Sequence, residues 1–408
     1  MKKGFSSICI DDHINGFLPE NIHTPPIYAG STFVYPSIEK AIKVFKGEDK
    51  SYIYSRWNNP GVALIESKIA LLEAYTTENI INDYSALAFS SGMAAIQSLL
   101  NSLYLKSGDS IIAQGNIYGT TVELMDTIYK NAGINIIYED FDNADKVLNL
   151  ISKTKNLKVV YLESPANPTL SCYDIKKYSK AAADAGAFSI VDNTFSTPYF
   201  QRPLQSGADF VIHSTTKFLN GHGTALGGFV ISKHKQHIED KLYTIRKVTG
   251  SIMSATDAWH LNNGLKTLEI RMEKHQQNSL ILAKFLLENK FIDKVHYPGI
   301  ETNKYHQLAK EQMFGFGGMM SFNLKGNMET AVRFMKAIKF CKITASLGTP
   351  DTLIQHPASM THIKVPKEQR LAYGINDTLI RISVGMEDIK NIKEDILNAL
   401  HVANNEKI

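Results

Sequence analysis

The chain has 408 residues, of which 44% are hydrophobic and 21% are charged, and its formal net charge is +4. This apolar content excludes a disordered chain, and the length predicts two or three domains. Because the charges nearly balance and no basic stripe is concentrated anywhere, the sequence argues against a nucleic-acid-binding protein.

The three cysteines, Cys9, Cys172 and Cys341, are odd in number and far apart in the sequence. This spacing fits neither a disulfide framework nor a CxxC metal motif, and it is typical of a reducing compartment. The N-terminus has two lysines but no apolar run of signal-peptide length. No window approaches the roughly 18 apolar residues of a membrane span. We therefore expect a cytoplasmic location.

The first 60 residues differ from the rest of the chain because they contain five prolines and no long helical period. Proline fixes φ and removes a hydrogen-bond donor, so this segment predicts an extended arm with one short helix near residues 37–46. Its apolar clusters favour an ordered arm over a disordered tail. We expect residues 1–60 to contact a neighbouring subunit.

From residue 61 onward, short apolar runs alternate with segments of helical period. The predicted helices are 62–75, 93–105, 120–132 and 175–185. The predicted strands are 85–89, 110–113, 134–138, 157–163, 187–192 and 209–213. This alternation predicts an α/β domain over residues 61–258, with a mostly parallel sheet covered by helices on both faces.

The remaining residues, 259–408, predict a smaller α+β domain. A long helix is expected from residue 259 to 289, followed by strands at 319–323 and 379–384 and helices at 330–339 and 387–403.

Polar residues follow three of the predicted strands, where ligands bind in open α/β sheets. The strand at 85–89 is followed by Ser91, Gly92 and Met93 at the start of a helix, and helix N-termini attract phosphate. Asp192 ends the strand at 187–192. Lys217 closely follows the strand at 209–213, where burial would lower its pKa and make the amine nucleophilic.

Pyridoxal phosphate requires this combination of residue types: a lysine for a Schiff base, an acid for the pyridine nitrogen, phosphate donors and a flat group against the ring. The candidates are Lys217, Asp192, the helix start at residues 91–93, Ser214, Thr216 and Tyr118. A GxGxxG fingerprint, a Walker A motif, HExxH and GxSxG are all absent from the sequence, and no metal site is expected.

The chain resembles the trans-sulfuration (Cys/Met metabolism) family of pyridoxal-phosphate enzymes, and the resemblance covers nearly its whole length. It implies the aspartate-aminotransferase-like fold (fold type I). The motifs that carry it are Tyr54-Ser55-Arg56, Ser91-Gly92-Met93, Tyr118-Gly119, Glu163-Ser164-Pro165-Ala166-Asn167-Pro168, Val191-Asp192-Asn193-Thr194, Ser214-Thr215-Thr216-Lys217, Ser346-Leu347-Gly348, His356-Pro357-Ala358-Ser359-Met360-Thr361-His362 and Arg381-Ile382-Ser383-Val384-Gly385.

The resemblance implies a role for each catalytic candidate. Lys217 would form the Schiff base and then shuttle protons, and Asp192 would keep the pyridine nitrogen protonated. Tyr118 would stack on the ring and protonate the departing γ group. Arg381 would bind the substrate carboxylate.

The same resemblance implies supporting residues and a shared site. The residues expected to bind the phosphate are Ser91, Gly92, Met93, Ser214 and Thr216. Asn167 and Ser346 would support the cofactor and substrate, respectively. Tyr54 and Arg56 would reach the phosphate in a neighbouring subunit, within a homotetramer built from dimers.

The residues that distinguish family members favour more than one activity. The segment at 356–362 resembles methionine γ-lyases, and Ala345 stands where cystathionine-handling members carry glutamate. In contrast, Thr120 and Lys247 replace a cysteine and an acidic residue typical of methionine γ-lyases, and the loop around Thr224 resembles O-acetylhomoserine sulfhydrylases.

We therefore predict γ-elimination of methionine or homocysteine to a thiol, 2-oxobutyrate and ammonia. The alternatives are O-acetylhomoserine sulfhydrylation, by γ-replacement with sulfide, and then cystathionine γ-synthase or γ-lyase activity. A hypothesis of another class is a non-catalytic binding scaffold, since a fold does not determine function.

Overall fold

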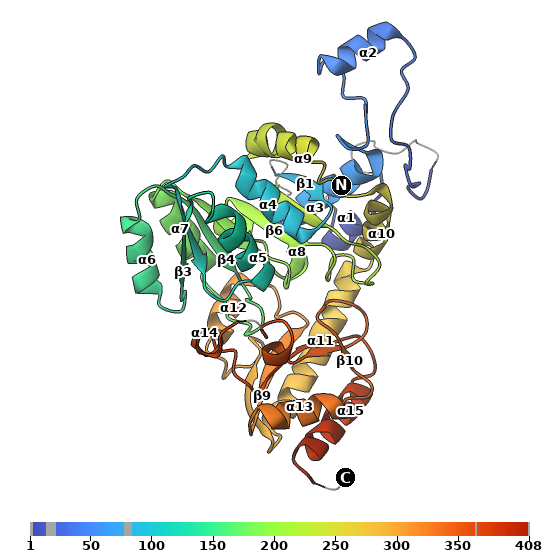
Figure 1. Ribbon diagram of the computed structural model, residues 1–408. Coiled ribbons are helices and arrows are strands. Elements are labelled where there is room, and N and C mark those ends of the chain that lie inside the picture. The colour runs from blue at the N-terminus through green and yellow to red at the C-terminus, as the bar shows by residue number, and fades with distance from the viewer. Residues whose placement is uncertain (1–2, 14–21, 77–83, 364, 407–408) are drawn as a thin grey trace.

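The computed structural model describes residues 3–13, 22–76, 84–363 and 365–406 of the chain. In Figure 1 the helix α2 stands apart at the top, a layered α/β domain lies below it, and the C-terminal part of the chain forms the lower end. None of the described helices is long and apolar enough to cross a membrane.

The N-terminal segment contains two helices, α1 (Phe5–Ile10) and α2 (Ile38–Phe45). The short helix expected near residues 37–46 is confirmed as α2, and it begins where the Ser37 hydroxyl accepts a hydrogen bond from the Lys40 N–H. The sequence did not predict α1, whose six residues are too few to show a helical period. Since α1 is buried against this chain's own core, the arm is not extended there. Pro19, one of the five arm prolines, lies outside the described residues.

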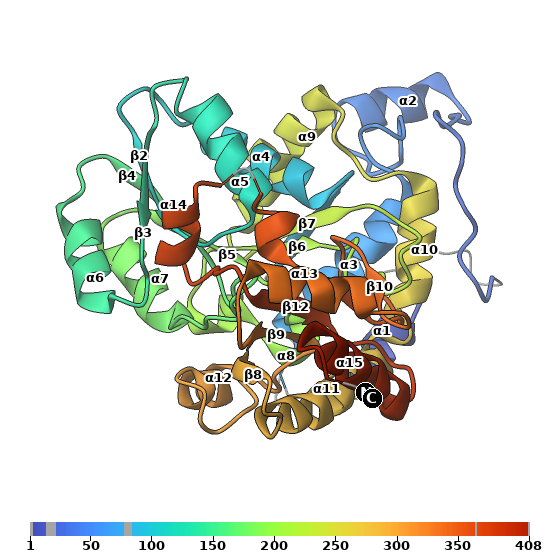
Figure 2. The ribbon, with the colours of Figure 1, turned by 60° about the horizontal axis from the view of Figure 1, so that its bottom comes forward.

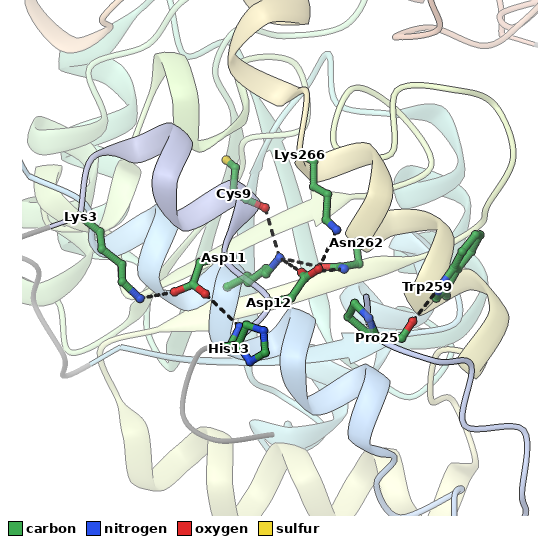
Figure 3. Close-up of polar contacts among 10 residues, drawn as sticks. Lys3, Cys9, Asp11, Asp12, His13, Pro25, Trp259, Asn262 and Lys266 are labelled. Carbon is green, nitrogen blue, oxygen red and sulfur yellow. Dashed lines mark hydrogen bonds and ion pairs between the residues drawn. The ribbon is translucent and has the colours of Figure 1, made fainter. Parts of the chain in front are cut away.

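A group of polar side chains, here called the Asp12 cluster (Asp12, Lys68, Asn262 and Lys266), fastens α1 to the body of the protein (Figure 3). The fully buried Lys68 amine donates to Asp12 Oδ1 at 2.6 Å, to Asn262 Oδ1 at 2.7 Å and to the Cys9 carbonyl at 3.2 Å. Lys266 donates to Asp12 Oδ2 at 2.6 Å. One carboxylate therefore holds two lysines, one in α3 (Pro60–Ala74) and one just after α10 (Ala255–Leu265).

The large domain begins with α3 (Pro60–Ala74) and contains a seven-stranded sheet in the order β1-β7-β6-β5-β4-β2-β3. Its strands are β1 (Ser85–Phe89), β2 (Ser110–Gln114), β3 (Asn135–Glu139), β4 (Leu157–Glu163), β5 (Phe188–Asp192), β6 (Phe210–Ser214) and β7 (Gly228–Ser232). All six predicted strands are confirmed to within one residue at either end. The unpredicted β7 pairs antiparallel with both β1 and β6, and the other pairings are parallel.

Helices cover both faces of this sheet, as predicted. On one face lie α4 (Gly92–Ser102), α5 (Gly119–Leu124), its continuation η2 (Met125–Tyr129) and η4 (His237–Leu242), which share a core with β1, β4, β5 and β6. The opposite face packs against α3, α6 (Ala144–Lys153) and α7 (Ile175–Asp184). Shorter helices follow at α8 (Thr197–Phe200), η3 (Pro203–Ser206) and α9 (Tyr243–Thr249).

The long helix expected from residue 259 is wrong in part, because it is two helices, α10 (Ala255–Leu265) and α11 (Leu268–Leu287). At the break, Thr267 has φ −113° and ψ 11°, outside helical geometry. The Gly264 carbonyl accepts from the Thr267 N–H at 3.3 Å and from the Arg271 guanidinium at 2.8 Å, and neither bond continues the regular pattern of the helix. The boundary expected at residue 258 falls inside α10.

The smaller domain contains a five-stranded sheet in the order β10-β11-β12-β9-β8. Its strands are β8 (Ile292–His296), β9 (Met319–Leu324), β10 (Lys342–Ile343), β11 (Leu353–Gln355) and β12 (Leu379–Ser383), and its helices are α12 (His306–Gln312), α13 (Met328–Ala337), η5 (Pro357–Ser359), α14 (Lys367–Ala372) and α15 (Ile389–Ala403). Figure 2 turns this domain toward the viewer and shows α13 and α15 side by side. The predicted strands at 319–323 and 379–384 are β9 and β12.

Candidate active site

A cavity of about 250 Å³ lies at the carboxyl ends of β4, β5 and β6. Ten of the predicted site residues line it: Ser91, Gly92, Met93, Tyr118, Asn167, Asp192, Ser214, Thr216, Lys217 and Arg381. A larger cavity, of about 830 Å³, lies between the N-terminal arm and α3, but it contains none of the predicted site residues.

One wall of the cavity is the start of α4, where backbone N–H groups are free to bind an anion. Ser91 caps this helix by accepting from the Ala94 N–H at 3.0 Å. The helix start lies so close to β6 that a Cβ added at Gly92 would be 2.9 Å from the Ser214 Cβ. Glycine therefore keeps open a cradle, beside the hydroxyls of Ser214 and Thr216, that fits a phosphate group.

Lys217 reaches the cavity from the segment after β6, and its amine donates to the Ser346 hydroxyl at 3.3 Å. Burial lowers the pKa of Lys217 to about 8, with a smaller contribution from the positive charge of Arg381. A larger fraction of this amine is therefore neutral near physiological pH than of an ordinary lysine, as a nucleophilic lysine requires.

Among the described residues, the hydrogen bonds to the Asp192 carboxylate all reach one of its two oxygens. Its Oδ1 accepts from Thr194, at 3.0 Å from the backbone N–H and 2.5 Å from the hydroxyl. The other oxygen accepts no hydrogen bond from the part of the chain that the structure describes. Burial raises the pKa of Asp192, whereas the two bonds from Thr194 oppose that rise. The unused oxygen fits an N–H donor such as a protonated pyridine nitrogen.

Tyr118 lies at the rim of the cavity, with 45% of its surface exposed. Its backbone N–H donates to Glu163 Oε1 at 2.6 Å. Glu163 is not among the residues predicted for the site from the sequence. The signal was available, because Glu163 ends a buried strand as Asp192 does.

Arg381 is a buried cation, with only 3% of its surface exposed. Its guanidinium donates to Asn167 Oδ1 at 3.0 Å and to the Ser346 carbonyl at 2.9 Å. Burial lowers its pKa to about 10, which still leaves it charged at neutral pH. Among the described residues, no aspartate or glutamate forms an ion pair with it, so Arg381 fits a carboxylate brought by a substrate.

Tyr54 and Arg56 lie outside this cavity. The Arg56 guanidinium donates to the Lys247 carbonyl at 2.5 Å and lies 5.3 Å from the centre of the Tyr54 ring. Their expected contact with the phosphate in a neighbouring subunit stays a prediction.

The residues that distinguish family members do not all lie at the cavity. Ala345 lines the cavity, whereas Thr120 is exposed at the start of α5. Lys247 lies in α9, where its amine is 5.3 Å from the Trp57 ring.

Comparison with known proteins agrees with this geometry. The family model for Cys/Met metabolism PLP-dependent enzymes matches residues 13–401. The chain is 43% identical to an L-methionine gamma-lyase of Fusobacterium nucleatum subsp. polymorphum over 92% of both chains. It is 38% identical to the cystathionine gamma-lyase of Bacillus subtilis, over 98% of this chain and 99% of that one.

A solved structure shares the whole fold. Cystathionine gamma synthase from Xanthomonas oryzae pv. oryzae, in complex with cystathionine, superposes with a TM-score of 0.91 at 31% identity over 100% of both chains. The resemblance and the fold class predicted from the sequence are thereby confirmed. The chain belongs to the Cys/Met metabolism family of pyridoxal-phosphate-dependent enzymes, and pyridoxal phosphate is its cofactor.

Proposed function

We propose that this enzyme catalyses the γ-elimination of methionine or homocysteine, which releases a thiol, 2-oxobutyrate and ammonia. The observation that carries the proposal is the pairing of Arg381, a buried cation with no acidic partner in the described chain, with Lys217 across one cavity. This pair fits an α-amino acid whose carboxylate binds Arg381 and whose Cα lies near the Lys217 amine.

The lining of the cavity supports a substrate with an uncharged side chain. Ile96, Phe195, Ala345 and Leu347 supply its apolar surface. The acidic residues in the described lining are Glu163 and Asp192, at the ends of β4 and β5. Neither fits the distal ammonium of cystathionine if Asp192 is engaged with the cofactor, and this favours a thioether or thiol.

Bound pyridoxal phosphate supplies an electron sink for the bonds at the substrate Cα and Cβ. In the proposed mechanism, the start of α4 would hold the phosphate and Asp192 would hold a proton at the pyridine nitrogen. Lys217 would hold the cofactor and, as a free amine steadied by Ser346, would move protons at Cα and Cβ. Tyr118 would lie against the ring, and its phenol would donate a proton to the departing sulfur.

We further propose that the working enzyme is a homotetramer built from dimers and located in the cytoplasm. The arm supports the assembly, because α2 leaves Ile38 and Phe45 68% and 63% exposed while Tyr54 and Arg56 lie outside their own chain's cavity. The three cysteines are free and buried, which supports a reducing compartment.

The second candidate is γ-replacement by sulfide on O-acetylhomoserine. It is favoured by the loop around Thr224, which resembles that of O-acetylhomoserine sulfhydrylases, while Thr120 and Lys247 depart from the methionine γ-lyase pattern. Cystathionine γ-lyase activity is a third candidate, supported by the Bacillus subtilis relative.

The test supplies the purified enzyme with methionine alone, O-acetylhomoserine with sulfide, or cystathionine. The proposal predicts 2-oxobutyrate and methanethiol from methionine at the highest kcat/KM of the three reactions. Homocysteine formation without turnover of methionine would refute it in favour of the sulfhydrylase. Lys217→Ala is the control in each arm, and loss of the yellow colour in that variant would exclude a non-catalytic scaffold. A colourless wild-type protein that takes up no cofactor would instead support the scaffold.

A further inference from the structure

Two carboxyl groups lie side by side at the floor of the cavity. Glu163 ends β4 and Asp192 ends β5, and the two residues are direct partners in the parallel register of these neighbouring strands. Partners in register direct their side chains to the same face of a sheet. Two adjacent carboxylates repel each other, so a single negative charge is the favoured state of such a pair.

The Glu163 carboxyl binds the main chain on two sides. Its Oε1 accepts from the Tyr118 N–H at 2.6 Å, and the Asn167 N–H also donates to the carboxyl. Glu163 itself is 5% exposed, and its own N–H donates to the buried Gln114 side chain at 3.0 Å. The carboxyl therefore joins the loop after β2 to the loop after β4.

Tyr118 depends on this contact for its position. It is the N-cap of α5 but makes no side-chain capping bond, and its carbonyl accepts from the Thr121 and Val122 N–H groups. The Glu163 carboxyl is thus what fixes the amide side of Tyr118, from which the half-exposed ring extends over the cavity.

We propose that Glu163 is a positioning residue, which acts as a neutral carboxylic acid that fixes the Tyr118 main chain and leaves the negative charge of the pair on Asp192. The inference rests on the proposed function, since it assumes that Tyr118 covers the cofactor ring and that Asp192 binds its nitrogen. Glu163 is then the group that sets both the position of Tyr118 and the charge of Asp192.

The ionisation of the pair agrees with this assignment. Burial raises the pKa of Glu163 and the charge of Asp192 adds to that rise, whereas the hydrogen bonds from the Tyr118 and Asn167 N–H groups oppose it. Thr194 stabilises the charged form of Asp192 through two hydrogen bonds, and His213 adds to that effect. The other titratable groups around the pair are Tyr118, Tyr161, Lys217 and Arg381.

The test compares Glu163→Gln with Glu163→Asp in the cofactor-loaded enzyme. Glutamine keeps the length and the acceptor but is always neutral, whereas aspartate keeps the acid but is too short to reach the Tyr118 N–H. Asp395→Asn is the matched control, because Asp395 is a buried carboxylate that accepts from two backbone N–H groups, both at 2.9 Å, in the smaller domain.

The first measurement is the visible circular dichroism of the bound cofactor, which reports the orientation of its ring and needs no substrate. We expect Glu163→Gln and Asp395→Asn to keep the wild-type signal, and Glu163→Asp to lose most of it. With substrate, we expect Glu163→Asp to lower kcat by roughly 10- to 100-fold with little change in KM, since small misplacements near reacting groups have effects of this size.

The second measurement is the pH dependence of the cofactor absorbance. Wild type is expected to show a change as the pH rises through the raised pKa of Glu163 that Glu163→Gln lacks, because glutamine cannot ionise. Loss of the dichroism in Glu163→Gln would show that a charge on Glu163 is required and would overturn the proposal, even if Glu163→Asp fails to fold. Wild-type dichroism and kcat in Glu163→Asp would overturn it equally. If the enzyme does not turn over methionine, the dichroism and absorbance measurements still test the role of Glu163, because they need no substrate.

Discussion

Replacing Asp12 by asparagine is expected to loosen α1 from the body of the protein. In the wild type, Asp12 Oδ1 accepts from Lys68 at 2.6 Å and Oδ2 accepts from Lys266 at 2.6 Å. Lys68 is fully buried, whereas the Lys266 side chain is 25% exposed and can be hydrated. The variant therefore leaves one ammonium buried with only neutral oxygens as acceptors, among them those of Asn262 and the Cys9 carbonyl.

Removing one partner of a buried ion pair typically costs about 3–5 kcal/mol. At about 1.4 kcal/mol for each factor of ten, the local opening of α1 is expected to become more frequent by roughly two to four powers of ten. Burial already lowers the pKa of Lys68, and without Asp12 it loses its proton more readily. The loss of stability is therefore expected to shrink as the pH rises, because the folded state then holds a neutral amine.

Native-state hydrogen exchange of the α1 amides measures this opening without unfolding the whole enzyme. Asp11→Asn is the matched control, because the neighbouring acid pairs with Lys3 at the surface, where such pairs contribute about 1 kcal/mol at most. Combining Asp12→Asn with Lys68→Met is expected to restore most of the protection, since no charge is then left buried. Equal exchange in the Asp12→Asn and Asp11→Asn variants would refute the reasoning.

Three further predictions concern the cavity. The rate at which apoenzyme takes up pyridoxal phosphate, followed by its visible colour, is expected to level off above about pH 8 because burial lowers the pKa of Lys217, and a rate still climbing at pH 10 would contradict this. Arg381→Lys is expected to raise KM and lower kcat/KM by roughly 100-fold in steady-state assays, since an ammonium cannot bind a carboxylate bidentately; an unchanged KM would show that the carboxylate binds elsewhere. Gly92→Ala is expected to weaken cofactor binding by roughly 10-fold in a cofactor titration, because its Cβ would lie 2.9 Å from that of Ser214. Gly119→Ala, whose Cβ would meet nothing within 4 Å, is its control, and equal affinities in the two variants would count against the phosphate cradle.

The central sheet could be predicted because its strands are buried on both faces and therefore appear as continuous apolar runs. The strand β7 has the same character, but it follows a glycine-rich loop and runs opposite to its neighbours. Its place between β1 and β6 is a long-range pairing that no local period reveals. The short exposed β10 and the six-residue α1 were missed because each is too brief to show a pattern.

In the candidate site, too, some residues could be predicted from the local sequence and others could not. Asp192 and Lys217 were predicted from position alone, since Asp192 ends one buried strand, β5, and Lys217 closely follows its neighbour, β6. Arg381 is far from them in the sequence and came only from the family resemblance. It reaches the cavity because β12 packs in the middle of the second sheet, and this placement depends on contacts between the two domains.

The arrangement of Arg381 and Lys217 also has a consequence for handedness. Under the proposed function, the substrate is held at three points: its carboxylate by the guanidinium, its amino group by the cofactor, and its Cα–H by the lysine amine on one side. Three fixed contacts around a tetrahedral carbon leave one direction for the side chain. The mirror-image amino acid would direct its side chain, in place of its hydrogen, toward Lys217, so the same two residues that bind and activate the substrate also select its enantiomer.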